Sequence, residues 1–368
     1  MKKKILVLLC VVLLLSCVLF SVVATASDSK DENVKELYSL SSSSQKAAVA
    51  AAYLYKDAHE IVLSVPYATV NLTQIAIMKI HSDERADALT YLNDRKNRQL
   101  ELLYNSMDDV GSRFDDVVDE YGYYSDACKS LKSAFSSLKS DAKKLIDATM
   151  ELISGSSSSY SSLYDSYESR LSSLLSEYED CLELTQKGFE DCIDDIGGLS
   201  NSDQLKIDVA CVYKEAGDLL VTLPYASIQL TQTALMQVFA GEKATGLSFL
   251  NKRADRQLQS AYNLMDKAVE DFISIEKEFE LSSGSSYASK RKELEKSFSS
   301  LRSASTELVR RTRALINGVD SGYDSYYTAY CEQLSVLSQK YDSYSDTFQN
   351  EFDALISSLL GSDFDLVG

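Results

Sequence analysis

The chain has 368 residues, and its 55 Asp and Glu residues outnumber its 37 Lys and Arg residues, which gives a formal net charge of −18. This acidity argues against nucleic-acid binding, because phosphate contacts need clustered cations. Two prolines, no tryptophan and 14 glycines also argue against an all-β fold, which needs a turn roughly every 8–12 residues.

The start of the chain has the features of an export signal. Lys2, Lys3 and Lys4 precede an almost wholly apolar run over 5–23, which leads into Ala-Thr-Ala. A basic flank, an apolar core and small residues at the end are typical of a cleaved secretory signal. The run is also long enough to span a bilayer, so an uncleaved signal anchor is an alternative, and a loose lipidation box ending at Cys17 is a third. Because the lysines stay inside, all three interpretations place the body outside the cytoplasm.

The remainder of the chain contains an internal duplication with an offset of 158 residues. SVPYATVNLTQIAIM around Pro66 matches TLPYASIQLTQTALM around Pro224, and these are the two prolines of the chain. A second pair of segments, beginning at Leu92 and Leu250, matches at the same offset, which grows to 163 further downstream. The repeat is too long for a solenoid unit, so we interpret it as a duplicated domain.

Each copy is predicted to fold as four long helices, because its apolar residues and tyrosines recur in steps of three and four, as in left-handed supercoiled packing. In the first copy the helices are expected over 44–80, 83–121, 126–153 and 159–196. Short loops make neighbouring helices antiparallel. We therefore expect an all-α fold of two tandem up-down four-helix bundles with long coiled-coil-like helices.

The expected organisation of the whole chain follows from these boundaries. It comprises a signal peptide or signal anchor over 1–26, a polar disordered linker over 27–43, bundle repeats over 44–198 and 203–361, and a tail over 362–368.

The two prolines predict a helix kink or break in each copy. A proline inside a helix removes one hydrogen bond and clashes with the preceding turn, at a cost of about 3 kcal/mol. Ser64 and Thr222 each lie two residues before a proline, where a hydroxyl can cap a restarting helix. We therefore expect helix kinks at Pro66 and Pro224.

Polar side chains kept in both copies gather near these prolines if the first two helices fold back about a tip near residue 83. They are Thr73, Gln74, Asn93, Arg95, Arg98 and Gln99 in the first copy, and Thr231, Gln232, Asn251, Arg253, Arg256 and Gln257 in the second. One hypothesis is a pocket in each copy that binds a carboxylate or phosphate through guanidinium, amide and hydroxyl donors. The other, which we favour, is a buried polar network that fixes the register between helices.

Five cysteines follow the signal segment, and none has a cysteine counterpart in the other copy. An odd number in an exported chain leaves at least one thiol unpaired or intermolecular. Candidate disulfides join Cys192 to Cys211, on either side of the loop between the copies, and Cys128 to Cys181. Buried free thiols are the alternative.

The sequence offers no constellation of catalytic residues. The two histidines are His59 and His81, and no H-E-x-x-H, C-x-x-C or glycine-rich phosphate loop occurs. We therefore expect no enzyme, no metal and no cofactor.

The predicted function is that of a non-catalytic binding or structural module, secreted or held on the outer face of the plasma membrane. Its expected partner is an extracellular protein, with no nucleic acid and with membrane contact only through the N-terminal segment. The alternative is an extracytoplasmic receptor for a small anion or peptide that uses the duplicated Arg/Gln/Thr cluster. A membrane-active toxin is a rival class, against which stands the lack of a second apolar stretch that could insert.

Overall fold

The computed structural model describes residues 42–81, 85–155, 159–239 and 241–360. The expected signal segment, all but the end of the expected linker and the expected tail lie outside these residues. The described residues are almost entirely helical and contain no strand, which confirms the all-α prediction. The chain divides between Ser200 and Asn201 into two compact units, which we call the first module (42–200) and the second module (201–355).

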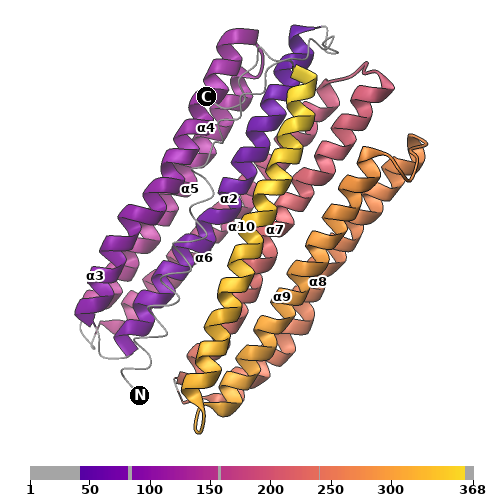
Figure 1. Cartoon of the computed structure of the whole chain (residues 1–368). Coiled ribbons are helices and arrows are strands. Elements are labelled where there is room, and N and C mark those ends of the chain that lie inside the picture. The colour runs from indigo at the N-terminus through magenta and orange to yellow at the C-terminus, as the bar shows by residue number, and fades with distance from the viewer. Residues whose placement is uncertain (1–41, 82–84, 156–158, 240, 361–368) are drawn as a thin grey trace. The chain divides into compact units, whose positions relative to one another are not determined.

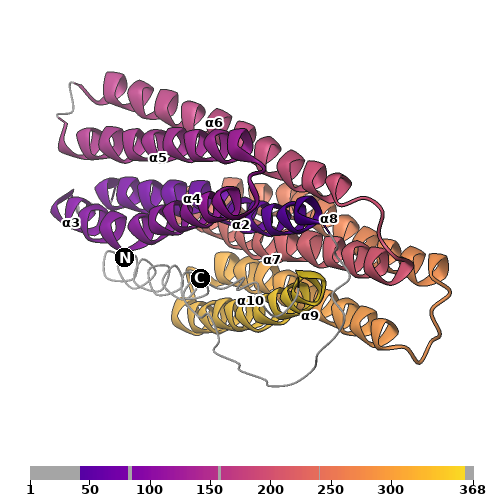
Figure 2. The same ribbon diagram turned by 90° about the horizontal axis from the view of Figure 1, so that it is seen from above.

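In the first module a central helix, α2, packs against each of the other long elements. The elements are α2 (Ser43–His81), α3 (Arg85–Arg95), the π-helix η2 (Lys96–Leu100), α4 (Glu101–Tyr121), α5 (Ser125–Ser154) and α6 (Tyr160–Asp195). They run alongside one another in Figure 1 and Figure 2. Residues 47–52 of α2 are each at most 1% exposed, because alanines and a valine let the neighbouring helices approach closely. This helix therefore forms the core of its module.

The second module repeats this order with fewer interruptions. Its helices are α7 (Asn201–Phe239), α8 (Lys243–Glu278), α9 (Ser286–Gly318) and α10 (Tyr323–Leu360). Helix α7 packs against α8 and α9. It also meets α10 through the rings of Tyr213 and Phe348, whose centroids are 5.8 Å apart. Phe348 in turn meets Phe298 of α9 edge to face at 5.9 Å.

Equivalent contacts close the same end of both modules. Arg85 donates a hydrogen bond to the carbonyl oxygen of Gly155 at 2.6 Å, where α5 ends. Its counterpart Lys243 donates to the carbonyl oxygen of Asn317 at 3.2 Å and to Asp320 at 2.9 Å, where α9 ends. In each module, the cation at the start of the second long helical segment (α3 or α8) thus bonds to the end of the third (α5 or α9). The two copies therefore share this contact.

Of the predicted kink or break at each proline, the break does not occur. Helix α2 continues through Pro66 and α7 continues through Pro224. The Ser64 hydroxyl donates to the carbonyl oxygen of Glu60 at 3.0 Å and the Thr222 hydroxyl to that of Asp218 at 2.8 Å, so each bonds to the preceding turn rather than capping a new helix. Hydroxyls bonded four residues back can bend a helix without interrupting it. The kink itself stays a prediction.

An unpredicted change of helix type occurs one helix later. The second long helix of the first module changes to a π-helix over Lys96–Leu100, whereas α8 of the second module passes through the equivalent residues as a continuous α-helix. The wider turn leaves Gln99 and Leu100 buried and Arg98 exposed.

Helix α2 is also long and apolar enough, by composition, to cross a membrane. This differs from the expectation that no segment after the signal meets that test. However, 61% of its most apolar stretch is buried inside the protein, which equally fits the core helix of a bundle.

Candidate functional site

The threonines of the predicted cluster serve the helix that carries them. Thr73 and Thr231 are completely buried. Their hydroxyls donate to the carbonyl oxygens of Val70 and Ile228, each at 2.9 Å. Each threonine also lies beside a tyrosine of the fourth long helix of its module, which is Tyr167 for Thr73. These threonines therefore face the packed interior.

Three of the four arginines of the cluster lie at the surface. Arg98, Arg253 and Arg256 are exposed to solvent, and Gln257 is exposed beside them. Gln99 is buried at 4% exposure. Arg98, Arg253 and Arg256 thus lie at the surface, whereas the threonines face the interior.

The remaining residues of the cluster are half-buried or exposed. Gln74, Asn93, Arg95 and Gln232 are half-buried, and Asn251 is exposed. Asn251 accepts a hydrogen bond from Arg313 of α9 at 2.7 Å, which links α8 to α9. This contact lies at the surface and not in a buried network, so both the buried register-fixing network and anion binding by the twelve residues stay predictions.

A buried ion pair is repeated in the two modules at a place the sequence analysis did not single out. The Lys56 side chain is 2% exposed and pairs with Glu60 at 3.1 Å. Its counterpart Lys214 is also 2% exposed and pairs with Asp218 at 2.8 Å. Because a buried ammonium needs a close counter-charge, the duplication of this pair indicates a structural role. A search at the 158-residue offset for lysines followed by acids four residues later would have found it.

The buried histidine His59 pairs with a hydroxyl, and the second copy has different residues at both positions. Nδ1 of His59 lies 2.8 Å from the Thr185 hydroxyl, and both side chains are at most 4% exposed. The aligned residues of the second module are Gly217 and Phe348. A polar pair in one core is thus matched by a small residue and an aromatic ring in the other. No group of three His, Cys, Asp or Glu side chains suited to a metal ion occurs among the described residues.

The five cysteines that follow the signal segment are free thiols in the structure, which corresponds to the alternative given for the candidate disulfides Cys192–Cys211 and Cys128–Cys181. Cys128 donates to Asp115 on α4 at 3.4 Å, whereas Cys181 donates to the carbonyl oxygen of Ala134 on α5 at 3.5 Å. The two thiols therefore have different hydrogen-bond partners, that of Cys128 on α4 and that of Cys181 on α5. Burial raises the pKa of Cys128 to about 11. In the same way, mainly burial raises the pKa values of Cys181, Cys192 and Cys211 to about 12. These thiols are therefore protonated and weakly nucleophilic at neutral pH.

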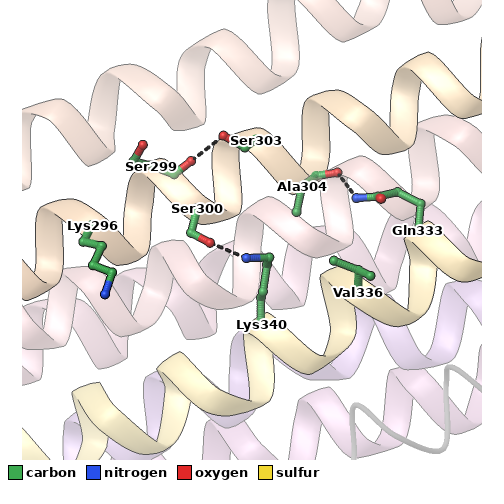
Figure 3. A pocket seen from close by; sticks show the side chains of 8 residues that line it. All are labelled: Lys296, Ser299, Ser300, Ser303, Ala304, Gln333, Val336 and Lys340. Atoms are coloured by element: carbon green, nitrogen blue, oxygen red, sulfur yellow. Dashed lines mark hydrogen bonds between the residues drawn. The ribbon is translucent and has the colours of Figure 1, made fainter.

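A groove of about 490 Å³ lies between α9 and α10 of the second module (Figure 3). It is lined by Lys296, Ser299, Ser300, Ser303, Ala304, Gln333, Val336 and Lys340. Gln333 donates to the carbonyl oxygen of Ala304 at 2.9 Å, and Nζ of Lys340 donates to the Ser300 hydroxyl. Val336 is 39% exposed and adds an apolar patch. Sequence reasoning missed this groove, because serine and lysine on an outward face resemble an ordinary solvated surface.

The first module has the opposite charge at the position of Lys340. At the 163-residue offset Lys340 aligns with Glu177 and Ser300 aligns with Ser137. Glu177 is hydrogen-bonded to Ser137, as Lys340 is to Ser300. Burial, followed by the charges of Asp141 and Asp180, raises the pKa of Glu177 above its ordinary value. The contact between the last two helices is thus kept while its charge is reversed.

No protein-family model matches the chain, and no curated protein or solved structure matches it either. The class of protein is therefore the one its own fold defines, an all-α protein composed of two compact helical units.

Proposed function

We propose that the chain is a non-catalytic binding and spacer protein, secreted or held on the outer face of the plasma membrane, built from two tandem up-down four-helix bundles. The observation that carries this proposal is the use made of the duplicated polar residues. The buried ones, such as Lys56 and Thr73 and their counterparts, form bonds within their own module. The duplicated features thus maintain two cores rather than surround a reaction centre.

The dimensions of the helices support the spacer role. Helix α10 has 38 residues and α7 has 39, which correspond to lengths of about 57–59 Å at about 1.5 Å per residue. Helices of this length, packed side by side, give rods that hold a surface at a distance from their point of attachment. A net charge of −18 favours a soluble body that does not adhere to anionic membranes.

Surface proteolysis tests this proposal. The full chain, with an epitope at its C-terminus, is expressed in its native cells, and proteinase is added to intact and to lysed cells. We expect the epitope in the medium, or on intact cells in a form that proteinase removes. An epitope that proteinase removes only after lysis would contradict the proposal, and a cytoplasmic protein probed on the same samples controls for leakage.

The receptor alternative receives less support at its predicted cluster. Arg98 and Arg256 are exposed, whereas Thr73 and Thr231 are completely buried. The double variant Arg98→Ala/Arg256→Ala removes these exposed cations without touching either core.

A further inference from the structure

The two lysines of the α9–α10 groove lack the counter-ions that an acidic protein can readily supply. Lys340 donates to a serine hydroxyl, and among the described residues no carboxylate pairs with Lys340 or with Lys296. The whole chain carries 55 acidic residues, and other lysines of the same module, such as Lys290, do form ion pairs. Two unneutralised ammonium groups therefore line one groove.

Hydroxyl donors accompany these cations. Ser300 accepts the hydrogen bond from Lys340, so its own proton is free to be donated to a ligand. Ser303 donates to the carbonyl oxygen of Ser299 at 2.9 Å, as Figure 3 shows, and the Ser299 hydroxyl lines the same groove. Lysine ammonium groups bind phosphate oxygens as point charges, and serine hydroxyls can donate further hydrogen bonds to the same oxygens.

The first module shows that helix packing does not require these lysines. Glu177 takes the place of Lys340 and keeps the bond to the aligned serine, while Ser133 takes the place of Lys296. The serines at 299, 300 and 303 are matched by serines at 136, 137 and 140. The serine scaffold is thus common to both modules, and the paired cations belong to the second.

Helix α9, which carries part of the groove, is also more positively charged than its counterpart α5 in the first module. Helix α9 carries eight Lys and Arg residues against three Asp and Glu, whereas its counterpart α5 carries five against four. The groove volume of about 490 Å³ falls within the range of roughly 300–1,000 Å³ found for small-molecule sites.

From these observations we propose that the α9–α10 groove binds a tetrahedral oxyanion, a phosphate or sulfate group, through Lys296, Lys340 and the hydroxyls of Ser299 and Ser300. The group is either a free anion or the ester end of a larger molecule, whose apolar part would lie against Val336. This inference gives the proposed binding module a ligand class, and it rests on that proposed function only for its biological setting.

Isothermal titration calorimetry on the full chain in detergent tests the site, with inorganic phosphate, inorganic sulfate and glycerol 3-phosphate as separate probes. We expect one saturable site for at least one probe. Tighter binding of glycerol 3-phosphate than of inorganic phosphate identifies an ester ligand, and the reverse order identifies the free anion. Lys296→Gln/Lys340→Gln should weaken binding about tenfold or more, because it removes two charge-assisted contacts.

Three further variants keep the test decisive. Lys340→Glu installs the residue that the first module uses at this place, so it should fold with an unchanged circular dichroism spectrum and lose binding. Lys143→Gln/Lys187→Gln removes two exposed lysines of the first module and matches the change in charge, and it should bind within about twofold of the wild type, as should Arg98→Ala/Arg256→Ala. Absence of binding in the wild type, or equal binding by Lys296→Gln/Lys340→Gln, would overturn the site. Either result would leave the outcome of surface proteolysis untouched.

Discussion

At the scale of single residues, the structure shows why a residue of one copy cannot simply be replaced by its counterpart in the other. Gly188 of α6 lies under the ring of Tyr55, and a Cβ atom at this position would stand 2.3 Å from the ring carbons Cε1 and Cζ. Tyr55 is 4% exposed and meets Phe114 edge to face at 5.4 Å, so its ring is held on both sides. The second module has Glu351 at the aligned position, where Tyr213 instead contacts Phe348.

Gly188→Ala should therefore destabilise the chain even though alanine favours helix. Overpacking costs about 1–3 kcal/mol, and the higher helix propensity of alanine returns about 1 kcal/mol. We expect a net loss of up to about 2 kcal/mol, measured by thermal unfolding. Gly197→Ala, just after α6, is the control for adding a methyl group without a clash, because nothing lies within 4 Å of its added Cβ. A melting temperature for Gly188→Ala equal to or above that of the wild type would show that the Tyr55 ring moves freely.

Glu177 provides a pH-dependent test at the same scale. Because burial and the charges of Asp141 and Asp180 raise its pKa in the folded protein, the folded state holds this proton more tightly than the unfolded chain. Ionised Glu177 consequently lowers stability at neutral pH, and the penalty fades as the pH falls toward the ordinary value of 4.5.

Glu177→Gln should raise the melting temperature by about 1–2 °C at pH 7, a small effect because the group is partly solvated. The gain should disappear near pH 4, while the amide keeps a hydrogen-bonding group for Ser137. Glu179→Gln, on the exposed side of the same helix, should give no comparable pH-dependent gain. A gain for Glu177→Gln that persists unchanged at pH 4 would rule out the linkage.

At the scale of elements, α2 and α7 show how packing overrides a local signal. Val62, Val65 and Ala68 are almost completely buried on both sides of Pro66. Holding this apolar stripe against the rest of the module favours one helix axis over a restart. The hydroxyl of Ser64 then bonds to the turn before it, which local sequence alone did not indicate.

Pro66→Ala should stabilise the protein by roughly 1 kcal/mol. A proline inside a helix costs about 3 kcal/mol relative to alanine, while removal of its buried ring loses about 1.6 kcal/mol at about 0.8 kcal/mol per methylene. Pro224→Ala is an independent repeat in the second module, and chemical denaturation measures both. A loss of stability in both variants would mean that the prolines are required for packing rather than tolerated.

The helices themselves could be predicted from the sequence because they depend on period. The expected helix over 44–80 is observed as Ser43–His81, and that over 126–153 as Ser125–Ser154. The π-helix over Lys96–Leu100 could not be predicted, since the matching segment RADRQL of the second copy stays α-helical. A shift in hydrogen-bond register of this kind depends on tertiary packing, which the local sequence does not encode.

At the scale of the whole molecule, the duplication could be predicted, but the division of roles between its copies could not. Matching segments pointed to Arg98 and Arg256 as partners of Thr73 and Thr231, but the structure has these two arginines exposed and both threonines buried. The groove with Lys296 and Lys340 lies in a part of the repeat where the copies differ. Similarity between the copies identifies residues of the shared cores. The groove would instead be found by searching for aligned residues of opposite charge, such as Lys340 and Glu177 at the 163-residue offset.

The serine bond between the last two helices of each module has a consequence for how such a protein can change. Since an ammonium in one copy and a carboxylate in the other satisfy the same hydroxyl, mutation can invert the local electrostatic sign there without loosening the scaffold. A chain that contains this helical module twice can therefore keep one copy as it is while the other acquires affinity for a new kind of ion.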